Sequence, residues 1–476
     1  MDTKKLRQKI LDLAIHGKLV PQDPNDEPAS VLLERIRAEK EQLIKEGKIK
    51  APKKSKSAGD TSHYPKDVPF EVPAGWVWTT LDSIARFSGG KTPSMDDKAN
   101  WDNGKHLWIT SKDMKSEAIC NSQIMLSDSG LQGMTIHQPG TILMVNRSGI
   151  LRRTLPLGIL QKEATINQDL KAITPFMFEL TPFLFFCLKA FEPIILQKYK
   201  KAGTTVDNIN FDHFVTIPIP LPPIQEQGRI VQSIQTWTSR IEDIEKSSDQ
   251  IQNAIEATKN IILELAIHGK IVAQDPSEEP AIESLKRINS AFQPSHNLHY
   301  EGELPNGWCF STIGDLFQHN TGKALNGKNQ AGEELRYITT SNLYWDRFDL
   351  KEVRTMPFTE AEKEKCRATK GDLLVCEGGD IGRTAIWPYD FDVMIQNHIH
   401  RLRPREDISV RFFYYVFLLY KQMGLIGGKG IAILGLSSRE LDKMVIPVPP
   451  VPEQHRIVTV IENIFAQMDA LASNLS

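Results

Sequence analysis

The chain has 476 residues, of which 40% are hydrophobic and 24% are charged, and its net charge is −2. These values are ordinary for a soluble protein of two or three domains and argue against a uniformly basic surface. No apolar run reaches membrane-spanning length, and the five cysteines contain no Cys-x-x-Cys pair. We therefore expect a cytoplasmic protein with reduced thiols, no signal peptide and no zinc site.

The N-terminal segment, residues 1–63, is predicted to be a helical region followed by a basic linker. Apolar residues recur at steps of four and three from Leu6 to Leu13, and a second amphipathic helix is predicted from Pro28 to Glu46. The lysine-rich tract from Lys48 to Ser57 is expected to be a flexible linker that could also touch phosphate.

The first globular block, residues 64–222, is predicted to be mixed α/β. Short strand-like runs such as Leu107–Thr110 and Thr141–Val145 are separated by glycine-bearing turns, and a helix is predicted from Pro182 to Lys200. Its stretch Ala85–Thr92 fits a relaxed phosphate-loop pattern, but Pro93 follows at once and no helical period begins there. A glycine-lysine turn lying against a nucleic-acid phosphate explains this stretch better than nucleotide binding does.

Residues 223–299 are predicted to begin with a long central helix. Its seam positions follow alternating steps of four and three: Ile230, Ile234, Trp237, Ile241, Ile244, Ser248, Ile251, Ile255, Thr258, Ile262 and Leu265. A narrow seam of this length favours a coiled coil over a helix that lies on the core of its own domain.

The second globular block, residues 300–449, is predicted to have the same mixed α/β skeleton. Strands are expected at Arg336–Thr339 and Asp372–Val375, and a helix at Val410–Gly424. The run His398–His400 lacks metal-ligand spacing, so we expect it on a strand surface. Residues 450–476 continue the helical seam with Ile457, Ile461, Ile464, Met468, Leu471 and Leu475.

The most informative feature is that the chain repeats its own plan. Leu13–Lys18 recurs as Leu265–Lys270, and Gly75-Trp76 recurs as Gly307-Trp308. The run Ile217–Pro220, followed by Glu226-Gln227, recurs as Ile446–Pro449, followed by Glu453-Gln454. The two ends of the chain together complete the second copy, which predicts a circularly permuted, pseudo-two-fold protein whose two long helices are antiparallel. The second proline run is two residues shorter, so the two junctions between block and helix need not be identical.

Polar, glycine-rich and basic patches occur at corresponding places in both blocks. Arg and Lys can bond guanine, Asn and Gln can pair with adenine, and glycines permit close approach to a backbone. The candidate DNA contacts in the first block are Ser88, Gly90, Lys91, Thr92, Ser111, Lys112, Arg147, Arg152, Arg153, Asn167, Gln168, Lys200 and Lys201. Those in the second block are Thr321, Lys323, Thr340, Ser341, Asn342, Arg383, Gln396, Asn397 and Lys429. No catalytic, cofactor or metal residue is assigned, because neither an amino-methyltransferase motif nor a strand-linked G-x-G turn is present.

The combination resembles the specificity subunit of type I restriction-modification enzymes. The likeness is carried by the repeated segments above, and Pro28–Lys50 also looks like the N-terminal extension of that family. The resemblance implies a mixed α/β fold in which two target-recognition domains each bind half of a split DNA sequence and are spaced by antiparallel coiled-coil helices. It further implies a non-catalytic chain, because its partners would be two methyltransferase subunits, which modify adenine N6, and restriction-translocase subunits. S-adenosylmethionine, ATP and Mg would then bind to those partners.

Two other classes of protein are compatible with a two-domain chain of this kind. One is an enzyme in its own right, such as a solitary methyltransferase or nuclease, against which the missing motifs argue. The other is a scaffold that holds protein partners on its helices and does not bind DNA. A gel-shift experiment with the chain alone and with a co-encoded methyltransferase separates the three classes.

Overall fold

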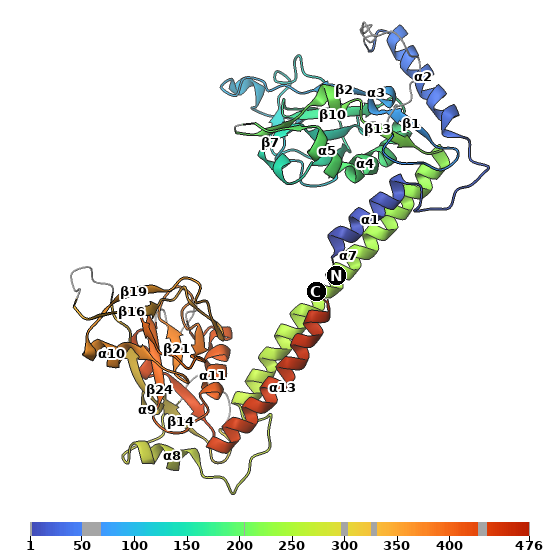
Figure 1. Cartoon of the computed structure of the whole chain (residues 1–476). Helices are drawn as coiled ribbons and strands as arrows, with labels where there is room; N and C mark the ends of the chain where they lie inside the picture. Colours follow the sequence, from blue (N-terminus) through green and yellow to red (C-terminus); the bar gives the residue numbers. More distant parts are fainter. Residues whose placement is uncertain are drawn as a thin grey trace. The chain divides into compact units, whose positions relative to one another are not determined.

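The computed structural model describes residues 2–49, 68–203, 205–296, 303–324, 331–426 and 436–475 (Figure 1). It divides into two compact units, Met1–Lys246 (unit 1) and Ser247–Ser476 (unit 2). Each unit is mixed α/β and has its own hydrophobic core. The basic tract from Lys50 onward and the block starts at residues 64 and 300 lie outside the described residues. Among the described helices, none is long and apolar enough to cross a membrane.

The described part of unit 1 contains three sheets and a two-stranded ribbon. Its helices are α1 (Thr3–Ile15), α2 (Ala29–Lys45), α3 (Leu81–Ile84), α4 (Thr181–Ala190), α5 (Glu192–Lys198), α6 (Phe211–Phe214) and the first part of α7 (Ile224–Ile267), with short turns η1 (Lys98–Asn100), η2 (Gly149–Arg152) and η3 (Phe178–Leu180). Its strands are β1 (Val77–Thr80), β2 (Ala85–Gly89), β3 (His106–Ile109), β4 (Ala118–Ile119), β5 (Met125–Leu126), β6 (Ile142–Val145), β7 (Arg147–Ser148), β8 (Leu157–Leu160), β9 (Ala164–Ile166), β10 (Leu170–Pro175), β11 (Lys200–Lys201), β12 (Asp207–Ile209) and β13 (Pro218–Leu221). The strand orders are β2-β10-β6-β8-β4, β5-β3-β9, β11-β12-β7 and β1-β13.

Unit 2 is built in a similar way. Its helices are the second part of α7, α8 (Ala281–Ile288), α9 (Ile313–Leu316), α10 (Glu360–Cys366), α11 (Val410–Gln422), α12 (Ser438–Asp442) and α13 (Val451–Leu475). Its strands are β14 (Cys309–Thr312), β15 (Phe317–Thr321), β16 (Glu333–Ile338), β17 (Leu343–Tyr344), β18 (Arg347–Phe348), β19 (Arg354–Phe358), β20 (Arg367–Ala368), β21 (Leu373–Cys376), β22 (Thr384–Ile386), β23 (Val393–Ile395), β24 (Ile399–Pro404) and β25 (Val445–Val448). The strand orders are β15-β24-β21-β22, β19-β16-β23-β20, β17-β18 and β14-β25.

The two units share a skeleton, as the sequence predicts. The strand order β2-β10-β6-β8 in unit 1 corresponds to β15-β24-β21-β22 in unit 2. Each unit also has a corresponding parallel pair, β3 with β9 and β16 with β23, and unit 1 has a second one, β4 with β8. Strands β6 and β21, which lie inside their sheets, are apolar and buried along their whole length, as is typical of strands covered on both faces.

A buried carboxylate fastens each long helix to its domain and explains why the repeated residues recur. In unit 1, Glu226 accepts hydrogen bonds from Trp76 Nε1 at 2.9 Å and from Gln22 Nε2 at 2.5 Å. In unit 2, Glu453 accepts them from Trp308 Nε1 at 3.0 Å and from Gln274 Nε2 at 3.2 Å. Burial raises the pKa of both carboxyls above its ordinary value. In both units the same pair of hydrogen bonds therefore joins three parts of the chain. These are the loop that carries Gln22 or Gln274, the domain that carries the tryptophan, and the long helix that carries the glutamate.

The two junctions between block and helix have the same length, so the shorter second proline run does not make them differ. Leu221 pairs with Val77 in β1, and Val448 pairs with Cys309 in β14, in the same ladder position. Leu221 and Val448 are 227 positions apart, as are Glu226 and Glu453, so no residue is missing from the second copy. An alignment made on the prolines shifts the second copy by two residues against the first. This shift is false, because the pairing register of the buried strand, and not the proline positions, defines which residues correspond.

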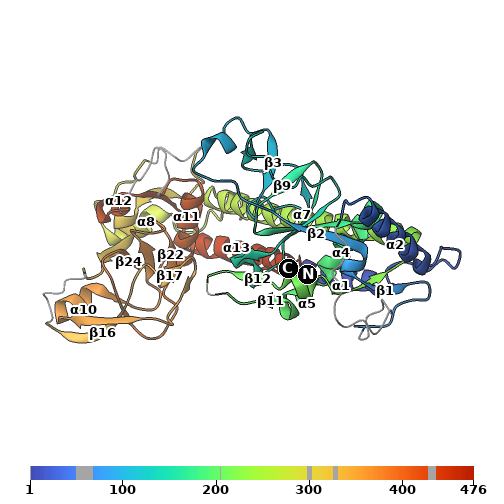
Figure 2. The same cartoon turned by 90° about the horizontal axis from the view of Figure 1, so that it is seen from above.

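In each unit a second helix packs antiparallel on α7 (Figures 1 and 2). In unit 1, Arg7 of α1 pairs with Glu245 at 2.8 Å and lies 3.9 Å from Glu242. In unit 2, Lys259 of α7 pairs with Asp469 of α13 at 2.6 Å. Arg7–Glu242 and Lys259–Asp469 occupy corresponding positions in the two copies.

The predicted seam of α7 is only partly buried. The buried seam residues are Ile230, Ile234, Ile241 and Ile255, whereas Trp237, Ile244, Ile251 and Leu265 are 37–47% exposed. Near its end the helix instead buries Leu263, Ala266 and Ile267. The reason is that each end of α7 also packs on a globular core, which turns the buried face away from a strict heptad seam.

The helix predicted from Pro182 to Lys200 is in fact two helices and the start of a strand. Helix α4 ends at Ala190, α5 begins at Glu192 with Pro193 in its first turn, and β11 begins at Lys200. Proline lacks the N–H that a continuous helix needs at that position, so the break falls in front of it.

Candidate nucleic-acid interface

A glycine-lysine turn lies beside an amide-rich turn in unit 1. Lys91 N donates to Ile166 O at 3.1 Å, and the Thr92 hydroxyl donates to the Gln168 side-chain oxygen. A β-carbon at Gly90 would lie 2.0 Å from Ile166 O, so this glycine makes room for the protein's own main chain. No helix begins here, which agrees with the rejection of a phosphate loop. The structure thus brings together Gly90 to Thr92 and Asn167 to Gln168.

Unit 2 repeats this arrangement with a different exposure of its lysine. Lys323 N donates to Ile395 O at 3.0 Å, next to Gln396 and Asn397. Lys91 is exposed, whereas Lys323 is 9% exposed and its Nζ bonds Glu362 at 2.8 Å and Pro357 O at 2.6 Å. The same turn therefore presents an exposed lysine in unit 1, whose Nζ bonds a main-chain oxygen, Gly133 O, and a buried lysine paired with a carboxylate in unit 2.

A second pair of equivalent turns adjoins the first. Asn167 N donates to Ile109 O at 2.9 Å, which places Ser111 and Lys112 beside the amide turn. In unit 2, Thr340 and Ser341 take the same place, while Asn342 is buried and its side chain bonds Thr339 N, Asp349 O and Glu352 O. The Asn342 amide is thus used within the protein, and Ser341 is the exposed side chain of this turn.

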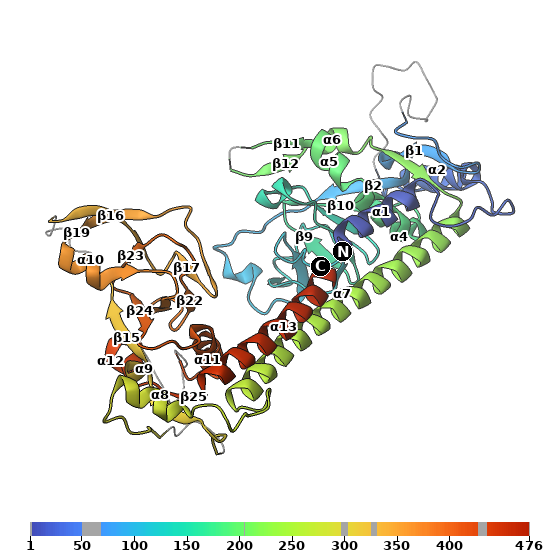
Figure 3. The same cartoon turned by 60° about the horizontal axis from the view of Figure 1, so that its bottom comes forward.

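In the three-stranded sheet β11-β12-β7, two strands of which are labelled in Figure 3, two cations and an amide face one another across the strands. Lys201 lies opposite Asn208, and Asn208 lies opposite Arg147. Residues that face each other across neighbouring strands project on the same side of a sheet, so the three side chains form one row. Lys201 and Arg147 are exposed and Asn208 is half-buried. Asn208 was not predicted from the sequence; its position between buried Asp207 and Ile209 is the alternation that indicates an outward-facing strand residue.

The opposite side of the same sheet holds the other basic candidates against a buried carboxylate. Asp207 lies 3.4 Å from Lys200 Nζ and 3.9 Å from Arg152 Nε. The backbone N–H of Gly203, followed by Lys200, holds the pKa of Asp207 below its ordinary value. Lys200 and Lys201 are neighbours in sequence, yet only Lys201 lies in the outward row.

The remaining candidates are distributed over each unit. Arg153 is exposed after η2, and Ser88 is half-buried on β2, opposite Ala172. In unit 2, Thr321 is half-buried at the end of β15, and the guanidinium of Arg383 donates to Thr340 O. Lys429 lies outside the described residues.

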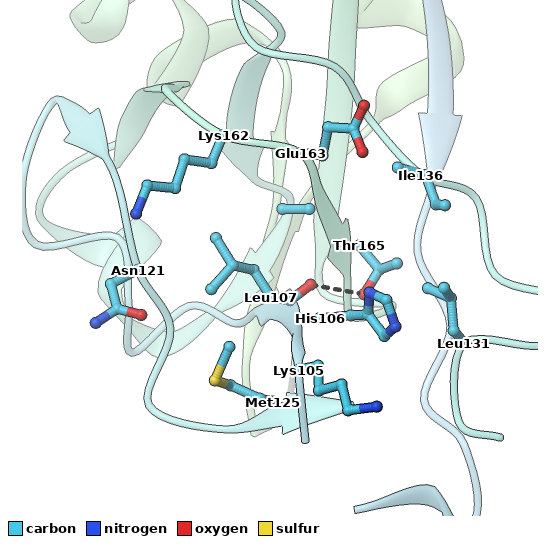
Figure 4. A pocket seen from close by; sticks show the side chains of 11 residues that line it. Lys105, His106, Leu107, Asn121, Met125, Leu131, Ile136, Lys162, Glu163 and Thr165 are labelled. Atoms are coloured by element: carbon cyan, nitrogen blue, oxygen red, sulfur yellow. Dashed lines mark hydrogen bonds between the residues drawn. The ribbon is translucent and has the colours of Figure 1, made fainter. Parts of the chain in front are cut away.

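The pocket in Figure 4 lies at the other ends of the strands that lead to these turns. It has a volume of about 360 Å³ and is lined by residues at the starts of β3 and β9, including His106 and Thr165, whose hydroxyl donates to Leu107 O at 3.0 Å. At its rim, Lys105 and His106 both bond Asp128. The pocket is therefore separate from the candidate turns.

The histidine run in unit 2 corrects an expectation. His400 is fully buried, not on a strand surface. Its Nε2 bonds Leu436 O at 2.7 Å, its Nδ1 lies 2.9 Å from His319 Nε2, and His319 Nδ1 lies 2.7 Å from Asp442. Burial lowers the pKa of His400 to about 4, so a neutral ring links two strands and α12.

Acid is expected to destabilise both units. Burial lowers the pKa of His137 in unit 1 to about 4, as it does for His400. Because the unfolded chain keeps the ordinary pKa of ~6.5, it binds more protons than the folded chain between pH 6.5 and 4. Stability is thus complete above pH ~6.5 and falls as the pH decreases, by about 2 kcal/mol per histidine at pH 5. Urea unfolding at pH 7 and pH 5 measures the loss; His137→Leu should reduce it, and the exposed-site control His455→Leu should not.

Comparisons with known proteins match this architecture. A model of the type I restriction modification DNA specificity domain matches residues 73–257 and again residues 305–475. The EcoEI and EcoAI type I restriction enzyme specificity subunits of Escherichia coli are each 26% identical to this chain, over 99% and 98% of it and 90% of their own lengths.

Two solved structures share the fold. An HsdS subunit from Thermoanaerobacter tengcongensis has a TM-score of 0.53 at 17% identity and covers 86% of this chain and 93% of its own. A chain from a study of complex assembly in the type I R-M system has a TM-score of 0.60 at 16% identity and covers 86% of this chain and 94% of its own. Together with the two matched domains, these likenesses show that the chain belongs to the family of type I restriction-modification specificity subunits, which recognise DNA sequence.

Proposed function

We propose that each unit recognises one half of a bipartite, asymmetric DNA target and that the chain positions partner subunits that methylate adenine N6 or cleave DNA. The observation that carries the proposal is that the two units share one backbone fold but present different polar side chains on it. The Trp76–Glu226 and Trp308–Glu453 bonds are the same, whereas Lys91 is exposed and Lys323 is bonded to Glu362. Two modules with one scaffold and different surfaces suit two different half-sites.

The helices support a role as a spacer. Helix α7 has 44 residues and belongs to both units. Because a helix rises ~1.5 Å per residue, the number of residues in α7 would set the distance between the two half-sites. In the proposed arrangement the two units are related by a pseudo-two-fold axis, with α1 and α13 forming antiparallel coiled-coil pairs with α7.

Two equivalent grooves support the binding of two identical methyltransferase subunits. One groove of about 480 Å³ is lined by α1, α4 and α7 and includes Arg7 and Glu242. The other, of about 510 Å³, is lined by α7, α11 and α13 and includes Lys259 and Asp469. Beyond the grooves, Ile244 is 47% exposed and its equivalent Leu471 is 60% exposed. Repeated apolar and charged surfaces of this kind fit one partner copy per unit.

The cofactors of the reaction belong, in this proposal, to the partners. S-adenosylmethionine would bind to the methyltransferase subunits, and ATP and Mg would bind to the restriction-translocase subunits. This chain contributes DNA sequence recognition and the placement of those subunits.

The test compares methylation with and without this chain. Genomic DNA from cells that express the cognate methyltransferase with this chain should carry a split motif containing methylated adenine, and DNA from cells with either protein alone should not. Methyl transfer by the highly purified chain alone would contradict a non-catalytic role. Motif methylation by the methyltransferase without this chain would show that sequence recognition lies elsewhere.

The two neighbouring lysines of β11 make a matched pair for DNA binding. Lys201→Ala removes an exposed cation from the outward row and should lower the slope of log K against log salt by about 1. Lys200→Ala removes the partner of Asp207 and should lower the thermal stability of unit 1 while changing that slope less. Fluorescence anisotropy of the methyltransferase complex at several salt concentrations measures both. Equal slopes for Lys201→Ala and the unmodified complex would exclude this row from the phosphate contacts.

A further inference from the structure

Two arginines of unit 2 share one aromatic ring. The guanidinium carbon of Arg347 lies 4.4 Å from the centroid of the Tyr344 ring, and that of Arg383 lies 5.1 Å from it. Tyr344 and Arg347 face each other across the β17–β18 hairpin, and Arg383 immediately precedes β22. Figures 2 and 3 show β17 and β22 as neighbours. The ring thus gathers two cations that are 36 positions apart in the sequence.

Neither arginine has a counter-charge in the described part of unit 2. The acidic residue next to Arg347 is Asp346, but its carboxylate bonds Arg411 at 2.6 Å. The acidic residue nearest before Arg383 is Asp380, which pairs with Lys421 at 2.8 Å. Two unpaired cations beside one ring repel each other, and an electron-rich partner from outside would remove that repulsion.

The pair is held in a fixed position. The hairpin is anchored by Leu343, which is fully buried, and by Phe348, whose ring lies 4.8 Å from that of Trp387. Asp346 N donates to Thr384 O at 3.2 Å, which ties the hairpin tip to β22. Arg383 also donates to Thr340 O, in the turn that precedes exposed Ser341. A planar guanidinium that is stacked and anchored keeps its remaining N–H groups oriented for two parallel hydrogen bonds.

We propose that Arg383 and Arg347, held by Tyr344, recognise a guanine in the half-target bound by unit 2. Arg383 is half-buried and anchored, and because its Nε is buried, its terminal Nη groups would supply the donors for the O6 and N7 acceptors of guanine. Arg347 is exposed on the hairpin, and its guanidinium would supply further N–H donors beside those of Arg383. Tyr344 is a positioning residue. The inference rests on the proposed function and names the base class that one unit recognises.

The test uses the complete methyltransferase complex and conservative variants. Arg383→Lys keeps the charge but loses the paired donors, so methylation at sites with guanine should fall about tenfold to a hundredfold relative to the other bases at one motif position. Arg347→Lys should have the same effect at that position or at the adjacent one. Tyr344→Phe keeps the ring and should leave the motif unchanged, whereas Tyr344→Leu should relax the same position. Thermal melting of each variant distinguishes a loss of recognition from a loss of folding.

The outcomes separate this inference from the function on which it rests. If the unmodified complex produces no split motif, the proposed function fails. If it produces one and Arg383→Lys weakens binding equally at all sequences, the pair contacts phosphate and the guanine assignment is wrong. An unchanged motif in both lysine variants also overturns the assignment. A change confined to the half-target of unit 2, with the other half intact, supports it.

Discussion

Replacing Ile244 with aspartate is expected to release one of the two methyltransferase subunits. Ile244 is 47% exposed in the free chain, so the substitution leaves folding intact. In the complex the side chain would be covered, and a buried aspartate without a partner would cost more than the ~2 kcal/mol lost with the apolar contact. Affinity should fall at least about thirtyfold. Native mass spectrometry should then find one methyltransferase subunit per chain instead of two.

The equivalent position provides the matched experiment. Leu471→Asp should release the other methyltransferase subunit, and the double variant should bind none. Gln252→Asp, on the same helix at an exposed polar position, is the control and should keep two. If Ile244→Asp and Leu471→Asp both retain two subunits, the partners dock elsewhere on the chain.

Lengthening α7 by seven residues is expected to lengthen the spacer between the half-targets. Every described residue of α7 between Ile241 and Ile255 is at least partly exposed, so an insertion after Ser248 disturbs neither unit's own packing. Seven residues add ~10 Å and turn the C-terminal part of the helix by only about 20° from its original direction. At ~3.4 Å per base pair, the spacer of the methylated motif should grow by about three base pairs.

A single-residue insertion at the same place is the contrasting variant. It adds ~1.5 Å but turns the C-terminal part of the helix by about 100°, so the two half-sites could no longer face one side of the DNA. Both units should melt as before, and methylation should be lost. A heptad insertion that leaves both activity and spacer length unchanged would show that α7 does not set the spacing.

Much of the shared fold of the two units could be predicted from the sequence, because the motifs that indicate it are short and each occurs twice. The recurring tryptophan and glutamate positions proved to be one hydrogen-bonded group, Trp76–Glu226 and Trp308–Glu453. The heptad pattern located α7 but overstated its burial, since periodicity does not say how much of a helix its partners cover. The alignment of the two proline runs failed for a related reason. The pairing of β13 with β1 and of β25 with β14 shows which residues of the two copies correspond, and the sequence does not show this pairing.

The candidate interface was only partly accessible from the sequence. The turns at Gly90 and Asn167 were predicted and lie together, but the burial of Lys323 depends on Glu362, which is distant in the sequence. The difference between Lys200 and Lys201 depends on which side of a strand each one faces. The association of Tyr344 with Arg383 arises only when the β17–β18 hairpin folds against β22. Contacts of this kind depend on tertiary packing, to which no local pattern corresponds.

Exchange of one recognition surface tests the central claim most directly. Residues 81–217 of unit 1 would be replaced with the corresponding block of a type I specificity subunit that has a different target. The exchange leaves β1, β13 and the Trp76–Glu226 bond in place. Sequencing of methylated genomic DNA should show one half of the motif changed, with the other half and the spacer length unchanged. A change in both halves, or in neither, would contradict independent recognition by the two units.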